Sequence, residues 1–86
     1  MKASMLYHPE SEFARGAEEY VHDFKKRTGQ DIELISLETK EGATAASLYD
    51  IVRYPALIVC QDNGDVVKFW EGEQLPLMNE VAGYLN

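Results

Sequence analysis

The stretch that decides the fold of this chain is residues 49–59, which read Tyr-Asp-Ile-Val-Arg-Tyr-Pro-Ala-Leu-Ile-Val. The apolar run that begins in its second half continues to Cys60. Residues 56–60 are apolar at every position, as expected for a strand that is covered on both faces of a sheet. Pro55 stands directly in front of this run, and proline is accepted at the first residue of a strand. The sequence therefore predicts a buried strand over residues 56–60 that a proline opens.

Two strands and a long helix are predicted upstream of this stretch. Residues 3–7 form a short apolar run that His8-Pro9 ends, and residues 32–37 form a second strand. Between them, apolar residues recur at helical spacing and predict a helix with one apolar face. The residues of that face are Phe13, Ala17, Tyr20, Val21 and Phe24.

Both ends of this helix carry capping signals. The hydroxyl of Ser11 is predicted to accept a hydrogen bond from a free amide of the first turn, and Glu10 and Glu12 lie near the positive helix end. A basic run, residues 25–27, matches the negative end of the helix, and Gly29 is the expected C-cap. A helix cap also explains Ser11 more simply than a catalytic role beside His8, which would need an orienting acid and an oxyanion site as well.

Downstream, the sequence predicts a helix over residues 41–51, a hairpin and a last helix. The hairpin joins residues 56–60 to a returning strand over residues 66–70, and its turn contains Asn63-Gly64, for which positive φ is expected at both residues. Gly72 breaks the returning strand, and Pro76 fits the first turn of the last helix. The expected inward residues are Ala45, Leu48 and Tyr49 in the middle helix and Leu77, Val81, Tyr84 and Leu85 in the last.

The resulting order is β-α-β-α-β-β-α, an α/β fold. Strands that alternate with helices require a parallel pair with a crossover, whereas the hairpin adds an antiparallel pair. A four-stranded mixed sheet with helices on both faces follows, and 86 residues leave room for one domain, residues 1–86. The expected fold class is thus a single α/β domain.

This order, together with residues 49–59, resembles the thioredoxin-like family of thioredoxins and glutaredoxins. In that family a helix ends in a segment of the type Tyr-Gly-Ile-x-x-x-Pro-Thr, and apolar strand residues follow the proline. The resemblance extends from Ala3 to Leu85. It implies that Pro55 is cis and that the loop before the first helix, the proline loop and the loop at Gly72 meet on one face.

The paired cysteines of that family are absent from this chain. Cys60 is the single cysteine, and the two family positions fall on Ser11 and Ala14, or on Glu12 and Arg15 after a shift of one residue. No catalytic residue and no cofactor is therefore expected. Cys60 itself is predicted to pack in the core as a small hydrophobe, and the alternative is a redox-sensing thiol.

Charge and residue spacing exclude several other functions. The chain has 15 acidic and 8 basic residues and a net charge of −7, which disfavours nucleic acid and anionic membranes as partners. His8 and His22 lie far apart with no cysteine near them, so no metal site is expected. The first residues do not resemble a signal peptide, and a cytoplasmic protein is the expectation.

Trp70 is either a core residue or an anchor for a partner.

The function that we predict from the resemblance is a redox-inactive module that binds an extended protein or peptide segment. In the family, such a segment pairs with the backbone of the residue before the cis-proline, which here is Tyr54. Acids on the neighbouring loops, Glu10, Glu12, Glu71 and Glu73, would favour basic partners, unless they are merely part of an acidic surface. The predicted groove comprises Ser11, Glu12, Arg53, Tyr54, Pro55, Glu71 and Gly72.

Two alternatives belong to other classes of protein. One is an atypical glutathione- or thiol-linked enzyme, for which only the proline and one glycine of the glutaredoxin pattern remain in Arg53-Tyr54-Pro55 and Glu71-Gly72-Glu73. The other is a structural protein that associates with itself through an edge strand or through a patch around Trp70. The sequence leaves the oligomeric state open.

Overall fold

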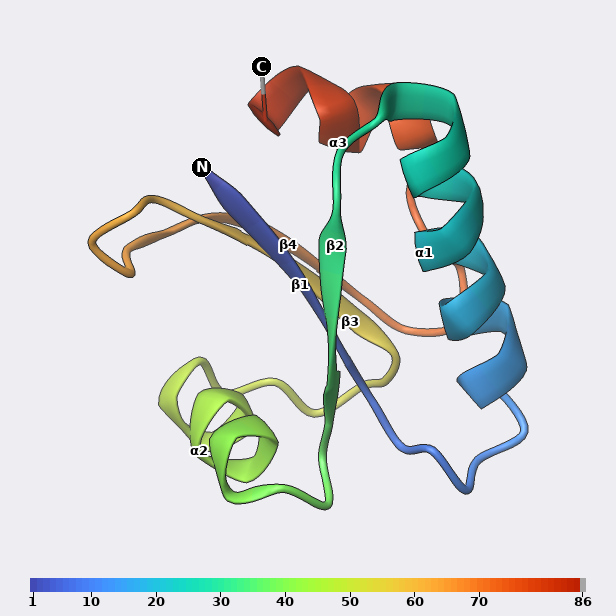
Figure 1. Ribbon diagram of the computed structural model, residues 1–86. Helices are drawn as coiled ribbons and strands as arrows, with labels where there is room; N and C mark the ends of the chain where they lie inside the picture. Colours follow the sequence, from blue (N-terminus) through green and yellow to red (C-terminus); the bar gives the residue numbers. More distant parts are fainter. Residues whose placement is uncertain (86) are drawn as a thin grey trace.

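The computed structural model describes residues 1–85 of the chain, and Asn86, the last residue of the expected domain, lies outside them (Figure 1). Within these 85 residues, three helices and four strands follow one another in the predicted order. They are β1 (Lys2–Tyr7), α1 (Ala14–Thr28), β2 (Ile32–Ser36), α2 (Lys40–Leu48), β3 (Ala56–Cys60), β4 (Val66–Glu71) and α3 (Met78–Leu85).

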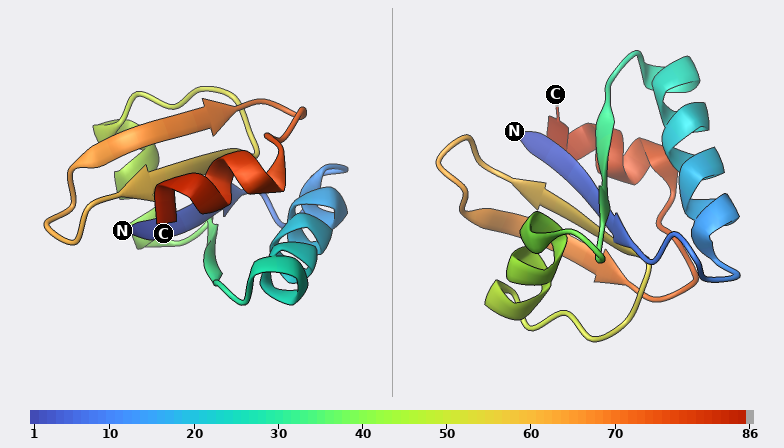
Figure 2. Two further views of the ribbon diagram at one scale, coloured as in Figure 1. Left: turned by 90° about the horizontal axis from the view of Figure 1, so that it is seen from above. Right: turned by 60° about the horizontal axis from the view of Figure 1, so that its bottom comes forward.

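The four strands form one mixed sheet in the order β2-β1-β3-β4. β1 runs parallel to β2 and antiparallel to β3, and the β3–β4 hairpin adds the second antiparallel pair. Helices α1 and α3 cover one face of the sheet and α2 covers the other (Figure 2). The predicted fold class is therefore confirmed.

Alternation along the two central strands divides the core into two clusters. In β3, Leu57 and Val59 face α1 and α3, whereas Ala56 and Ile58 face α2. Side chains of a strand point alternately to the two faces of a sheet, so a strand buried on both sides must be apolar throughout. This is the physical reason for the unbroken apolar run of residues 56–60.

The C-terminal end of α1 is as predicted. Gly29 has a φ of 75°, and its N–H donates to the carbonyl of Lys25 over 2.9 Å. A residue with a Cβ adopts this left-handed conformation only at a steric cost, so glycine is the natural terminator.

The N-terminal end of α1 corrects the sequence prediction. The helix begins at Ala14 rather than at Ser11, and its N-cap residue, Phe13, makes no side-chain cap. The Ser11 hydroxyl instead donates to the carbonyl of His8 over 2.8 Å, within the turn that precedes the helix. A hydroxyl used in this way closes the turn and does not cap a helix three residues further on.

Several smaller predictions for the downstream elements were also wrong. α2 ends at Leu48, whose side chain is 70% exposed, and α3 begins at Met78, so that Leu77 precedes the helix and is 72% exposed. In the hairpin turn only Gly64 has a positive φ, and Asn63 does not. The turn closes with Gly64 N–H donating to Gln61, which places the single left-handed residue after the bend.

Candidate functional site

The three loops that were expected to meet do border a common hollow. It has a volume of about 390 Å³ and opens broadly to solvent. Its lining comes from the residue before α1, from the loop before β3 and from the loop after β4: Phe13, Arg53, Tyr54, Gly72 and Glu73.

Main-chain and side-chain hydrogen bonds join two of these loops. The N–H of Gly72 donates to the carbonyl of Pro55 over 3.1 Å, which extends the β3–β4 pairing by one step. The Glu71 carboxylate accepts from the N–H of Val52 at 3.3 Å and from that of Arg53 at 3.4 Å. The end of β4 thereby holds the loop in front of the proline in place.

Tyr54 lies half-buried at this junction. Its hydroxyl donates to the carbonyl of Ile51 over 2.7 Å, and its ring meets that of His8 edge-on with 5.1 Å between centroids. Burial raises the pKa of the Tyr54 hydroxyl, and the nearby charge of Glu71 raises it further. The hydroxyl is therefore neutral at physiological pH and acts here as a structural hydrogen-bond donor.

The main chain of Tyr54 has an unusual conformation and unusual hydrogen bonding. Its peptide bond to Pro55 is cis. Among the hydrogen bonds found within residues 1–85, none uses the backbone N–H or C=O of Tyr54. Both groups are strong hydrogen-bonding groups that favour a partner, and Tyr54 is one of the residues that line the open hollow.

The structure separates the predicted site residues into three groups. Arg53, Tyr54 and Gly72 line the hollow, whereas Pro55 is buried and Glu71 contributes through its two hydrogen bonds to the neighbouring loop. Ser11 and Glu12 do not line the hollow. Of the four acids that were grouped together, only Glu73 contributes to the lining.

Phe13 is a site residue that sequence reasoning missed. Its helical spacing indicated an inward position, but it is 39% exposed and lines the hollow. The late start of α1 explains the difference, because Phe13 is the N-cap and does not share the orientation of the helix face that follows.

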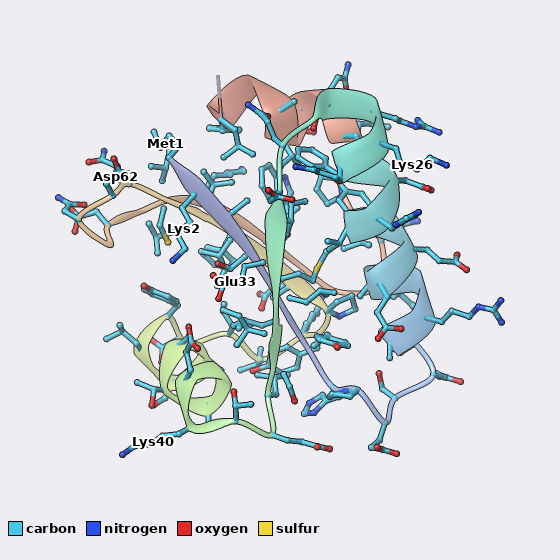
Figure 3. The ribbon with its side chains drawn as sticks, in the orientation of Figure 1. Met1, Lys2, Lys26, Glu33, Lys40 and Asp62 are labelled. Carbon is cyan, nitrogen blue, oxygen red and sulfur yellow. The ribbon has the colours of Figure 1, made fainter. Side chains whose placement is uncertain are left out.

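Cys60 lies away from this hollow and packs against the core cluster beneath α2, as predicted, but it is half-buried and not fully enclosed. It occupies the opposite end of β3 from Pro55, roughly 16 Å along the strand. Together with Lys2, which pairs with Glu33 over 3.5 Å (Figure 3), it lines a second hollow of about 220 Å³ against α2. Tyr49 lines the same hollow, and its hydroxyl donates to the carbonyl of Gly64 over 3.4 Å. Burial raises the pKa of Tyr49, and the neighbouring Cys60 raises it further.

Within residues 1–85, no group of three or more His, Cys, Asp or Glu side chains is placed to hold a metal ion. His8 and His22 are both exposed. Over the same residues no helix combines the length and the apolar character that crossing a bilayer requires.

Solved structures with the same arrangement identify the fold. Thioredoxin 1 from the thermophilic eubacterium Thermosipho africanus superimposes with a TM-score of 0.68 over 99% of this chain and 90% of its own length, at 15% identity. The fold is thioredoxin-like. A malarial protein (TM-score 0.66, 10% identity, 96% of this chain and 90% of its own) is also similar to this thioredoxin-like chain. So is mitochondrial thioredoxin 3 from Saccharomyces cerevisiae in its oxidized form (TM-score 0.64, 10% identity, 94% of this chain and 72% of its own length).

At these identities the similarity describes the fold alone. No family model matches the sequence, and no curated protein matches it. In this thioredoxin-like chain the segment leading into α1 contains no cysteine, and the single thiol lies at the far end of β3.

Proposed function

We propose that this chain is a binding module that takes up an extended peptide segment at the Tyr54 hollow and that does not exchange disulfides. The observation that carries the proposal is the main chain of Tyr54, a residue of the hollow's lining whose N–H and C=O have no hydrogen-bond partner within residues 1–85. An extended segment that pairs with these two groups would gain affinity from its backbone, and side chains on either side would provide selectivity.

The lining suggests which segment fits best. Phe13 offers an exposed aromatic ring, and Arg53 and Glu73 place one charge of each sign at the rim. The whole chain carries a net charge of −7, which attracts cationic partners from a distance and raises their association rate. We therefore favour a peptide with an apolar side chain for Phe13 and a basic residue for Glu73.

The cysteine content supports the absence of disulfide exchange. Exchange within one chain requires an attacking thiolate and a second sulfur that resolves the mixed disulfide. This chain has one cysteine, and it lies at the end of β3 that is remote from the Tyr54 hollow. A peptide bound at Tyr54 would meet no thiol of this chain.

Selection from a displayed library of random linear peptides tests the proposal. Selected peptides would be synthesised, and their dissociation constants measured by calorimetry with the wild-type chain and with Phe13→Ala. We expect Phe13→Ala to raise Kd about tenfold, which is the effect of losing roughly 1.4 kcal/mol of apolar contact. Glu73→Gln should mainly slow the association of basic peptides and reduce its dependence on salt.

Leu77→Ala is the matched control, because Leu77 is also an exposed apolar residue but lies just before α3, outside the lining. It should leave Kd unchanged. Selected peptides that respond to Leu77→Ala and not to Phe13→Ala would contradict the proposal. Displacement of the peptides by glutathione at low concentration would instead favour the glutathione-linked alternative.

A further inference from the structure

The outer edge of β4 is an uncovered strand edge. β4 is the last strand of the sheet, and no other strand pairs with its outer side within residues 1–85 (Figure 2). Three consecutive residues, Val67, Lys68 and Phe69, are exposed, and Phe69 is 40% exposed although it is a large apolar side chain. Uncovered edges with apolar side chains favour pairing with another strand.

The hydrogen bonds of the hairpin show which backbone groups of β4 point outward. Gly72 donates to Pro55 and so turns its bonding groups toward β3. In an antiparallel pair this orientation alternates, so Trp70 and Lys68 also bond toward β3, and Phe69 and Glu71 present their N–H and C=O to the outside. Beyond Lys68 a register shift opposite Val59 and Cys60 interrupts the alternation.

We propose that two copies of this chain associate through β4, as antiparallel strands related by a two-fold axis at Phe69. In this register the two Phe69 residues face each other and exchange both of their outward backbone hydrogen bonds. The two sheets then form one continuous eight-stranded sheet. The proposal is independent of the Tyr54 hollow.

Charge disfavours the symmetric registers that are centred on a charged residue. A two-fold axis at Lys68 would place the two lysines directly opposite each other, which is unfavourable. With the axis at Phe69, each Lys68 lies opposite Trp70 of the second copy, on the face of the sheet that α3 covers. Lys68 already approaches its own Trp70, with 5.7 Å between Nζ and the ring centroid, so the pairing extends an existing cation–π contact.

A second copy of this chain matches the apolar side chain and the charges along this edge better than an acidic or basic partner would. The exposed centre of the strand is apolar at Phe69, and its nearest charges, Lys68 and Glu71, have opposite signs. In the proposed register Glu71 lies opposite Val67 of the second copy, so no like charges face each other across the strands. Overall, each copy carries −7, so the association should be weak at low salt and stronger at high salt.

Sedimentation equilibrium from about 10 μM to 1 mM tests the proposal. We expect the average mass to rise toward twice the 9.7 kDa of one chain, and to rise further when salt is added. Phe69→Glu should remain monomeric, since it places two carboxylates at the axis. Leu34→Glu on the other edge strand, β2, is the control, because Leu34 is 38% exposed, and it should associate as the wild type does.

Circular dichroism spectra of both variants, compared with that of the wild type, are the check that each is folded. A wild-type chain that stays monomeric at about 1 mM in high salt would overturn the proposal. So would an association that Leu34→Glu weakens as much as Phe69→Glu does.

Cross-linking tests the register without relying on Phe69→Glu. In a Cys60→Ser background, Phe69→Cys should form a disulfide-linked dimer under mild oxidation, since hydrogen-bonded partners lie about 5.5 Å apart between Cα atoms, within disulfide range. Val67→Cys should cross-link far more slowly, because the two copies of this position are offset by four residues, roughly 13 Å. Equal cross-linking rates for the two variants would overturn the register.

Discussion

At the scale of single residues, Tyr20 links α1 to the segment before α3. Its hydroxyl donates to the carbonyl of Pro76 over 2.8 Å, and its ring lies nearly parallel to that of Phe24, with 6.4 Å between centroids. Burial raises the pKa of Tyr20 to about 12, and the charge of Glu80 contributes to the rise. A phenolate has no proton to donate to the Pro76 carbonyl, and burial disfavours its charge. The folded chain therefore favours the neutral hydroxyl.

The pKa of Tyr20 predicts a loss of stability in alkaline solution. The folded pKa of about 12 lies above the unfolded value of 10, so the contribution of the neutral hydroxyl is complete below about pH 10 and is lost as the pH rises through 12. The urea concentration at the unfolding midpoint should therefore decrease as the pH rises from the lower to the higher of these two pKa values. The decrease should be smaller for Tyr20→Phe. At neutral pH that variant should lose about 1 kcal/mol, the usual contribution of one hydrogen bond. Equal alkaline slopes for the two proteins would contradict this assignment.

Single residues also show how far the site can be predicted from the sequence. Arg53, Tyr54 and Gly72, which line the hollow, could be singled out in the sequence because each lies at or beside a local signal, either the proline or the break after a strand. The role of Glu71 was not predictable, because its carboxylate binds the amides of residues 52 and 53 only after the chain has folded back over 18 residues. Phe13 was missed because its exposure depends on where α1 begins.

At the scale of elements, α1 and α2 each contain a glycine near the start of the helix, and the two glycines differ in the space around them. Gly42 in α2 is buried, and a Cβ at this position would overlap the carbonyl oxygen of Ser36 at the end of β2. Gly16 in α1 is exposed, and a Cβ there would meet nothing within 4 Å. The first glycine permits a close approach of helix and loop, whereas the second only reduces helix propensity.

Alanine at these two positions should therefore change stability in opposite directions. Gly16→Ala should stabilise the chain by up to about 1 kcal/mol, the propensity difference within a helix. Gly42→Ala gains the same propensity but must displace backbone, and a net loss of about 1–3 kcal/mol is expected. Chemical denaturation of the two variants checks this, with Gly16→Ala as the matched control. Stabilisation by both substitutions would show that α2 has room to move away from β2.

Element boundaries were predictable where a backbone conformation demands one residue type. The end of α1 at Gly29 is such a case, because a positive φ favours glycine. The start of α1 is not, because the Ser11 hydroxyl can serve either a helix amide or the preceding carbonyl, and here it bonds to His8. Only the path of the chain from β1 decides between these two partners.

At the scale of the whole molecule, the two core clusters share the same two strands. β1 and β3 each contribute side chains to both clusters, so neither face of the sheet keeps its packing when the central strands separate. Order and layering were predictable for the same reason, since the apolar run of β3 requires cover on both faces. The sheet therefore couples α2 to α1 and α3 although the helices lie on opposite sides (Figure 1).

This coupling predicts that the chain unfolds as one cooperative unit. Trp70 reports on the α1 and α3 face, because its ring meets that of Tyr84 with 5.8 Å between centroids. A second reporter, Tyr49→Trp in a Trp70→Phe background, places the fluorophore in the cluster beneath α2. In each protein the urea transition followed by fluorescence should coincide with that followed by far-ultraviolet circular dichroism, as two-state unfolding requires. If the fluorescence midpoint of the Tyr49→Trp protein preceded its dichroism midpoint, α2 would detach on its own, and burial on both faces of β3 would not suffice to couple the two layers.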